Sequence, residues 1–252
     1  MTKIALITGA TAGIGQAIAC RLAENGYNLI ITGRREARLL ELKNDLENKF
    51  QIKVLALPFD VRKYGEVVAS LEHLPDEWDH IDVLVNNAGL AVGLNPIHTG
   101  VVDDWERMID TNIKGLLYVT RTISPGMVSR KRGHIINIAS IAGKDVYPNG
   151  NVYCATKHAV DALSKAMRID LLPYNIKVTQ ICPGAVETEF SIVRFKGDEA
   201  KADQVYKGFT PLDANNIADA VLYVVSQPPH VDVQDMLIMP TAQATGSLFH
   251  KE

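Results

Sequence analysis

The sequence predicts an α/β protein: one doubly wound domain in which a parallel sheet carries helices on both faces. Short β-branched, apolar runs alternate with longer amphipathic segments along the 252 residues. Strands that are buried on both faces are apolar throughout, so this alternation is typical of a parallel sheet covered by helices. No linker, repeat or low-complexity tract interrupts the pattern, so residues 1–252 are expected to form a single domain.

Six strands and four long helical segments are expected in alternation. The strands are the apolar runs at residues 3–8, 28–32, 53–59, 81–86, 134–139 and 177–182. Helical periodicity lies between them, at residues 15–26, 36–49, 103–130 and 151–172. This order of elements is that of a Rossmann-type fold. The polar and apolar mixture at 185–210 breaks the rhythm after the sixth strand and is expected to be a substrate loop.

Composition indicates an ordinary globular protein and excludes several classes of partner. The net charge is −3 without a basic block, which argues against nucleic acid and anionic membranes as partners. No apolar run reaches the roughly 18 residues of a membrane span, and the N-terminal apolar run is too short for a signal peptide. Three distant cysteines and scattered histidines predict neither disulfides nor a metal site. A cytoplasmic location is expected.

A glycine-rich turn follows the first strand, in the sequence TGATAGIG at 8–15. Gly9, Gly13 and Gly15 have the spacing G-x3-G-x-G, which differs from the common dinucleotide fingerprint G-x-G-x2-G. Glycines between a strand and a helix let the backbone approach a pyrophosphate, whose charge the helix N-terminus favours. The turn therefore predicts a dinucleotide cofactor, against the alternative of a turn built for tight packing alone.

The end of the second strand predicts which dinucleotide is bound. NAD-binding proteins of this type place an acidic residue there, on the ribose 2′-hydroxyl. Here Gly33 stands in that position, followed by Arg34 and Arg35. Two guanidinium groups can bind a 2′-phosphate, whereas as solvated side chains they would oppose the dipole of the helix that follows. The sequence therefore favours NADP over NAD.

A tyrosine and a lysine share one face of the helix expected at 151–172. Tyr153 and Lys157 are four residues apart, and no other tyrosine of the chain has a lysine at this spacing. A nearby ammonium favours the phenolate and so lowers the pKa of a phenol from its usual value near 10, which suits it to general acid–base catalysis. Ser140 ends the fifth strand, where its hydroxyl can hydrogen-bond a substrate carbonyl.

Together these motifs make the sequence similar to the short-chain dehydrogenases/reductases over essentially its full length. The matching features are TGxxxGxG at 8–15, NNAG at 86–89, Asn112 in DTNIKG, Ser140, YxxxK at 153–157 and PGAVET at 183–188. Each motif is weak alone, but their combined order and spacing are specific. The resemblance implies an oxidoreductase that moves a hydride between a nicotinamide and an alcohol or carbonyl carbon.

The resemblance also implies roles for single residues. Tyr153 would be the proton donor in reduction, and Ser140 would orient the substrate oxygen. Lys157 would hold the nicotinamide ribose and lower the pKa of the phenol, and Asn112 would bind a water linked to Lys157. Besides Tyr153 and Lys157, the expected cofactor-binding residues are Gly9, Thr11, Gly13, Ile14, Gly15, Arg34, Arg35, Asp60, Val61, Asn87, Gly89, Pro183, Gly184, Val186 and Thr188.

Five further stretches, TGRREARL, LPDEW, NNAGLAVG, GNVYCATK and VRFKGD, together make the sequence look like the NADP-dependent 3-hydroxy acid dehydrogenases within the family. Those enzymes act on serine, allo-threonine and related short acids, and some reduce malonic semialdehyde. Arg194, in the segment SIVRFKGD, is expected to bind the substrate carboxylate, with Lys196 as the second candidate. A carbonyl reductase acting on neutral ketones or aldehydes is one alternative, and a non-catalytic NADP-binding sensor is another. The resemblance also implies a homotetramer.

Overall fold

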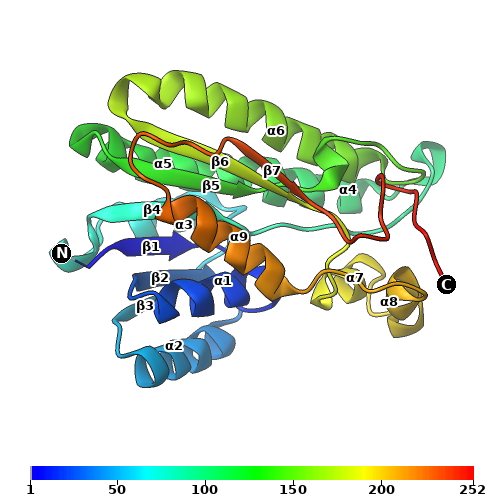
Figure 1. Ribbon diagram of the computed structural model, residues 1–252, viewed down its shortest axis with the longest axis horizontal. Coiled ribbons are helices and arrows are strands. Elements are labelled where there is room, and N and C mark those ends of the chain that lie inside the picture. Colours follow the sequence, from blue (N-terminus) through cyan, green and yellow to red (C-terminus); the bar gives the residue numbers. More distant parts are fainter. Residues whose placement is uncertain (1) are drawn as a thin grey trace.

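The computed structural model describes residues 2–252 and confirms the predicted fold class. Seven parallel strands form one sheet in the order β3-β2-β1-β4-β5-β6-β7, with helices on both faces (Figure 1). The strands are β1 Ile4–Ile7, β2 Asn28–Gly33, β3 Val54–Pro58, β4 Ile81–Asn86, β5 Gly133–Ile138, β6 Ile176–Pro183 and β7 Asp235–Ile238. Strand order reverses between β1 and β4, which is where doubly wound sheets open a ligand crevice.

The helices divide into two layers that bury the two faces of the sheet. One layer holds α1 Gly13–Glu24, α2 Glu36–Phe50 and α9 Ala214–Ser226. The other holds α3 Tyr64–Leu71, α5 Leu116–Arg130 and α6 Asn151–Leu171. The strands contribute side chains alternately to the two layers: Leu6 and Leu84 to one core, Ile7 and Val85 to the other. This alternation explains why the strands are apolar without interruption in the sequence.

The structure differs from the sequence expectations in three respects: where one helix ends, what the 185–210 segment contains, and which elements were not predicted. The helical stretch expected at 103–130 is α4 Val102–Ile109 and α5, joined by a π-helical turn at Asp110–Gly115. The segment expected as a loop at 185–210 contains two short helices, α7 Glu189–Arg194 and α8 Glu199–Tyr206. The elements α3, α9 and β7 were not predicted. The eight residues of α3 carry little periodicity, and β7 is half exposed rather than buried, whereas the 13 residues of α9 have an apolar face that local pattern could have indicated.

The described chain has neither a membrane-spanning helix nor a metal cluster. No helix within residues 2–252 is long and apolar enough to cross a bilayer. Over the same residues, no three histidine, cysteine or acidic side chains are grouped so that they could hold a metal ion. All three cysteines are free.

A buried histidine links two central strands. His134 of β5 is 5% exposed, and its Nε2 lies 2.8 Å from the hydroxyl of Thr179 on β6. That hydroxyl donates to the carbonyl of Val233 at 2.6 Å, so Nε2 of His134 is the donor in their pair. Burial, assisted by the charge of Lys177, lowers the pKa of His134 to about 3.

Because His134 stays neutral when folded, acid should destabilise the protein through this residue. Between pH 6.5 and about 3 the unfolded chain binds a proton that the folded chain refuses, so the free energy of unfolding falls as pH falls. His134→Gln keeps an N–H donor and removes the titration. Urea unfolding from pH 7 to 4 should show a smaller loss for the variant, the difference approaching about 1.4 kcal/mol per pH unit. If the parent and His134→Gln lose the same free energy of unfolding as pH falls, His134 is protonated in the folded protein.

Candidate active site

The structure brings the predicted site residues to one edge of the sheet. Each residue that lines the crevice between β1 and β4 follows the carboxyl end of a strand or lies on a helical segment that packs over that end. They are Gly9, Thr11, Gly13, Ile14 and Gly15 after β1; Arg34 and Arg35 after β2; Asp60 and Val61 after β3; Asn87 and Gly89 after β4; Ser140 after β5; Gly184, Val186 and Thr188 after β6, whose last residue is Pro183; and Asn112, Tyr153 and Lys157 on the π turn and α6. Parallel strands make this convergence possible.

The turn after β1 is fixed by glycine geometry and by a bond to the neighbouring strand. Gly9 and Gly13 have φ values of +67° and +54°, which other residues rarely adopt. A Cβ on Gly15 would lie 2.3 Å from the carbonyl oxygen of Gly9, so α1 can start here only with glycine. The Asn87 amide donates to the carbonyls of Thr8 and Gly9 at 2.9 and 3.1 Å. Backbone can therefore approach a ligand closely in front of α1.

The arginines after β2 form a cationic corner together with Arg38 of α2. Arg35 donates to Oγ1 of Thr11 from Nε at 3.1 Å and from Nη2 at 2.9 Å. Its Nη1 lies 3.1 Å from the carboxylate of Glu189, which also lies 3.0 Å from Nη1 of Arg38. Arg34 makes no hydrogen bond or ion pair within residues 2–252. Sequence reasoning missed Arg38 and Glu189, because their contact joins residues about 150 positions apart.

The two residues predicted after β3 occupy different environments. Asp60 accepts hydrogen bonds from the Arg62 side chain, and although burial opposes this, those bonds hold the pKa of its carboxyl below its usual range. Val61 is buried against the π turn, where a Cβ on Gly115 would lie 2.8 Å from its side chain. Asp60 thus stays ionised and paired with Arg62 at the crevice edge, and Val61 packs against the π turn beside it.

Ser140, Tyr153 and Lys157 are held in place by the packing of the turn after β5 against α6. Ser140 lies two residues beyond β5, and its Oγ accepts from the backbone N–H of Ala142 at 3.1 Å. A Cβ on Gly143 would lie 2.6 Å from the carbonyl oxygen of Lys157, so this turn touches α6. Lys157 Nζ donates to the carbonyl of Ile138 at 2.9 Å and lies 5.9 Å from the centre of the Tyr153 ring.

Burial shifts both titratable groups toward their neutral forms. Desolvation, with a smaller contribution from Tyr147, raises the pKa of the Tyr153 phenol, and Arg194 and a hydrogen bond with Ser140 oppose it only in part. Desolvation lowers the pKa of Lys157 to about 8. The lowering of the phenol pKa by Lys157 therefore stays a prediction. The guanidinium of Arg194, which sequence analysis assigned only to the substrate, is the cation that lowers it.

Asn112 lies in the π turn and braces the crevice floor. Its Oδ1 accepts from the backbone N–H of Leu90 at 2.7 Å, and its Nδ2 donates to Leu90 O at 2.8 Å and to Thr156 Oγ1 at 3.0 Å. The amide therefore ties the segment after β4 to α6. The water that the sequence resemblance implied would have to use the second lone pair of Oδ1, because the other polar positions already have protein partners.

The segment after β6 passes in front of α1 and leads into α7. The backbone N–H of Gly184 donates to Ile238 O at 2.7 Å, which ties the end of β6 to β7. Thr188 caps α7 by accepting from Phe190 N at 3.3 Å, and a Cβ on Gly13 would lie 3.3 Å from the Thr188 Cβ. Val186 is buried beside this contact. The segment and the glycine-rich turn thus face each other across the crevice.

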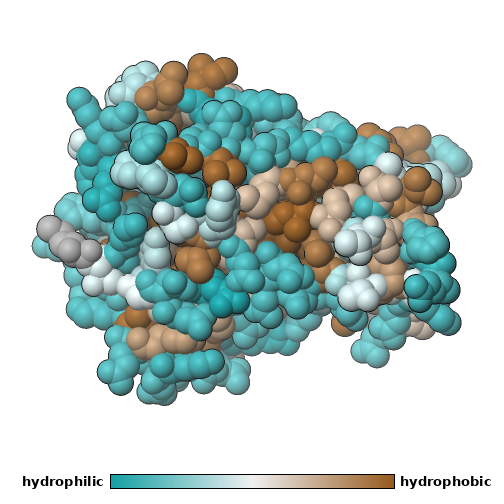
Figure 2. All heavy atoms as spheres, in the orientation of Figure 1, coloured by the Kyte–Doolittle hydropathy of each residue, from teal (hydrophilic) through white to brown (hydrophobic). Residues whose placement is uncertain are grey.

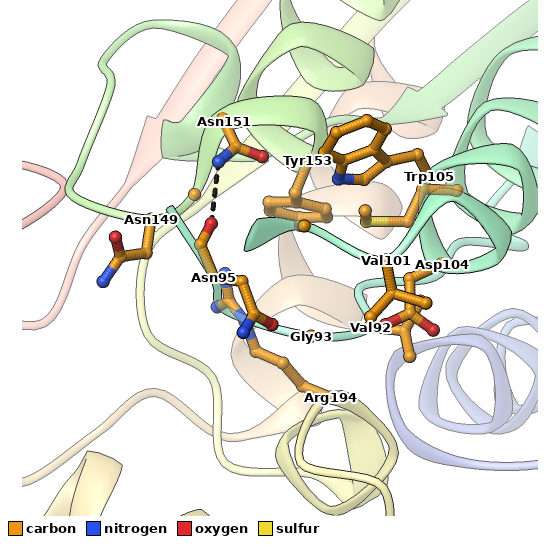
Figure 3. A pocket seen from close by; sticks show the side chains of 13 residues that line it. Val92, Gly93, Asn95, Val101, Asp104, Trp105, Asn149, Asn151, Tyr153 and Arg194 are labelled. Atoms are coloured by element: carbon orange, nitrogen blue, oxygen red, sulfur yellow. Dashed lines mark hydrogen bonds between the residues drawn. The ribbon is translucent and has the colours of Figure 1, made fainter. Parts of the chain in front are cut away.

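A small pocket lies in front of Tyr153, and Arg194 closes one side of it (Figure 3). The cavity is about 10 Å³, room for about one water. Arg194 Nη2 donates to the Tyr147 hydroxyl at 2.5 Å, and its guanidinium carbon is 5.4 Å from the centre of the Tyr153 ring. Its Nε is buried without a partner, and no carboxylate within residues 2–252 pairs with it. Tyr147, which holds the Arg194 guanidinium through this hydrogen bond, is a residue that sequence motifs did not indicate.

The second sequence candidate for the substrate carboxylate, Lys196, lies in a different position. Its Nζ is 2.8 Å from the carboxylate of Asp104, whose side chain is only 5% exposed. The pocket lining is completed by amide side chains at its mouth: Asn95, Asn149 and Asn151, with Asn151 donating to the carbonyl of Asn95 at 2.9 Å (Figure 3). Lys196, itself exposed, is thus paired with a carboxylate of the protein, whereas Arg194 has no such partner within the described residues.

Comparison with known proteins agrees with this geometry. The family model described as short chain dehydrogenase matches residues 3–199. The chain belongs to the short-chain dehydrogenase family. It is 50% identical to the NADP-dependent 3-hydroxy acid dehydrogenase YdfG of Salmonella typhi, over 97% of this chain and 98% of that protein. It is 42% identical to sulfoacetaldehyde reductase 2 of Chromohalobacter salexigens, over 97% and 96% of the two chains.

A solved structure is also close to this one. The closed form of serine dehydrogenase complexed with NADP+ superimposes with a TM-score of 0.92 at 47% sequence identity. The match covers 99% of this chain and 100% of that chain. The family and the fold predicted from the sequence are therefore confirmed over nearly the whole chain.

The buried Lys157 should make the protein more stable as pH rises. Between about pH 8 and 10.5 the unfolded chain holds a proton that the folded chain releases, so the free energy of unfolding increases with pH. Lys157→Met should abolish this increase, whereas the exposed Lys207→Met should retain it. Thermal or urea unfolding of the cofactor-free protein across pH 7.5–10.5 measures the effect. A Lys157→Met profile that rises as steeply as the parent's would mean that Lys157 is not the group responsible.

Proposed function

We propose that the protein is an NADP-dependent oxidoreductase that interconverts the hydroxyl and carbonyl forms of short 3-hydroxy acids. The observation that carries the substrate class is Arg194, a guanidinium without an acidic partner that lies over the ring of Tyr153. A charged group that is partly buried and unpaired is costly, and a substrate anion would offset that cost.

The crevice has the donors that a 2′-phosphorylated dinucleotide requires. The glycine turn and the N-terminus of α1 suit the pyrophosphate. Lys157 has one acceptor, Ile138 O, among the described residues, so its other N–H donors can hold ribose hydroxyls. Arg34, Arg35 and Arg38 provide guanidinium groups for the 2′-phosphate, and no carboxylate stands at Gly33 to repel it. Bound NADP(H) supplies or accepts the hydride.

Tyr153 is assigned as the acid–base residue and Ser140 as its partner on the substrate oxygen. Because burial raises its pKa, the phenol is protonated at neutral pH and ready to donate a proton in reduction. In oxidation the phenol must first lose that proton, so oxidation should gain more than reduction as pH rises. Asn112 acts here by holding the β4 segment against α6.

The position of Arg194 suits substrates with an anion two bonds from the reacting carbon. In a 3-hydroxy acid the carboxyl carbon is two bonds from the carbinol carbon. In sulfoacetaldehyde, which gives the Chromohalobacter relative its name, the sulfur lies at the same separation from the aldehyde carbon. The planar guanidinium can bind two oxygens of either group. We therefore place serine, 3-hydroxypropionate and malonic semialdehyde in the substrate class and treat sulfoacetaldehyde as a test compound.

Two other functions were considered from the sequence. A reductase of neutral ketones or aldehydes would leave Arg194 unpaired during the reaction, which makes it the second candidate. A non-catalytic NADP-binding sensor should have a damaged site, whereas Ser140, Tyr153 and Lys157 are all present and packed together. This argues against the sensor.

The 185–210 segment is proposed to act as the substrate loop, although it is partly helical, because it supplies Arg194.

We also propose a homotetramer in the cytoplasm. Several apolar side chains are exposed on helices and on the edge strand β7, and Figure 2 shows apolar atoms gathered along β7. They include Val102, Ile109, Leu117, Ile169, Leu172 and Leu237. Sedimentation should give four times the chain mass. The three free cysteines fit a reducing compartment.

Removing the phenol hydroxyl tests the acid–base assignment. Tyr153→Phe keeps the ring that packs against Phe190 but has no proton to transfer. The turnover number should fall by about 10²–10⁴-fold while NADPH binding, followed by cofactor fluorescence, is retained. Turnover within threefold of the parent would remove Tyr153 from the mechanism.

Replacing the pocket arginine tests the substrate class. Arg194→Met should lower kcat/KM for a 3-hydroxy acid by roughly 30- to 1000-fold, equivalent to about 2–4 kcal/mol, because the substrate carboxylate loses its partner. The same substitution should lower kcat/KM for a neutral alcohol of similar size far less. Lys196→Met, whose parent side chain is paired with Asp104, is the matched control and should affect acid and neutral substrates alike. Equal losses on both substrates for Arg194→Met would favour the neutral carbonyl reductase.

A further inference from the structure

Glu189 occupies the cationic corner that the proposed function assigns to the cofactor phosphate. Its Oε2 accepts from Nη1 of Arg35 at 3.1 Å and its Oε1 from Nη1 of Arg38 at 3.0 Å. The other two donor nitrogens of Arg35 are bonded to Thr11. Each nitrogen of Arg35 therefore has a protein partner, and the only negatively charged one is Glu189.

This contact joins the two halves of the crevice. Arg35 caps α2 and Arg38 lies in its first turn, on the cofactor side. Glu189 is the first residue of α7, and Arg194 is the last residue of the same helix, on the substrate side. Any displacement of Glu189 from α2 thus acts on the short helix that carries the proposed carboxylate-binding residue.

A carboxylate and a phosphate cannot both use these guanidinium groups at full strength. Two anions at one site repel each other, and the Nη1 donors that face Glu189 would have to be shared. The side chains of Arg35, Arg38 and Glu189 are all about half exposed, and ion pairs of that kind are weak. A 2′-phosphate, which carries more charge than a carboxylate, can therefore displace Glu189.

We propose that Glu189 is an internal competitor for the 2′-phosphate and so sets the affinity and selectivity for the cofactor. Without a 2′-phosphorylated nucleotide, Glu189 holds α7 against α2; binding of the phosphate releases α7. Nucleotides that lack the 2′-phosphate leave the contact intact. The inference rests on the proposed NADP function and adds a residue and a coupling that this function does not require.

The first test measures binding of nucleotide fragments, which involves no catalysis. Adenosine 2′,5′-bisphosphate and AMP differ only in the 2′-phosphate. In Glu189→Gln, titration calorimetry should show the bisphosphate bound about three- to tenfold more tightly than in the parent, because the competing anion is gone. The affinity for AMP should be unchanged, since AMP lacks the 2′-phosphate that would bind these arginines.

A neighbouring residue provides a matched control for the loss of charge. Glu187 is exposed, lies two residues before Glu189 and makes no side-chain hydrogen bond or ion pair within the described chain. Glu187→Gln removes the same charge from the same segment. It should change bisphosphate affinity by less than about 1.5-fold, the size of a distant, screened charge effect.

The second test follows the release of α7 directly. Hydrogen exchange of backbone amides in 189–206 should become faster in the parent when adenosine 2′,5′-bisphosphate is added, because the contact with α2 is broken. AMP should have no such effect. In Glu189→Gln the exchange should already be fast and should not respond to either nucleotide.

Three results would overturn the inference. Weaker bisphosphate binding by Glu189→Gln would mean that Glu189 helps to hold the nucleotide instead of competing with it. Equal gains in Glu187→Gln and Glu189→Gln would reduce the effect to net charge. A parent protein that binds AMP as tightly as the bisphosphate would contradict the proposed NADP function itself, and the inference would fall with it; the first two results leave that function intact.

Discussion

The hydrogen bonds between Thr8 and Asn87 hold the site together. The Thr8 hydroxyl accepts from the backbone N–H groups of Asn87 and Ala88, both at 3.0 Å, and the Asn87 side chain returns two bonds to the backbone at Thr8 and Gly9. These bonds join the ends of β1 and β4, where the strand order reverses. The glycine turn, the floor of the crevice and the start of α1 are therefore fixed as one unit before any ligand binds.

The charged side chains around this unit fall into two groups, those with an oppositely charged partner in the protein and those without one. Asp60 is neutralised by Arg62, and Asp104 by Lys196. Lys157 and Arg194, by contrast, lie near Tyr153 without a carboxylate partner inside the described chain, at the cost of desolvation. Cations left unpaired where a ligand reacts are typical of functional sites. Both stand where an external molecule, rather than the fold, can offset their charge.

The sequence predicted the sheet, its first six strands and the residues that meet at its carboxyl edge, because these depend on local pattern. Apolar runs mark buried strands, glycines with positive φ mark the turn, and Tyr153 and Lys157 share a face through helical spacing alone. It did not predict Arg38, Glu189 or Tyr147, whose roles arise from contacts across 47 to 154 positions of sequence. It also could not show that burial raises the pKa of Tyr153, since burial is a tertiary property.

The helix α7 connects these observations, because its two ends face the two proposed ligands. Glu189 at its start neutralises arginines on α2, while Arg194 at its end stacks over Tyr147 and Tyr153 and leaves a cavity with room for about one water. That pocket is partly open and Arg194 forms one of its sides, so a substrate carboxylate that enters it would meet the guanidinium. Under the inference above, an anion that displaces Glu189 acts on the helix that also carries Arg194, so six residues of chain link the two proposed sites.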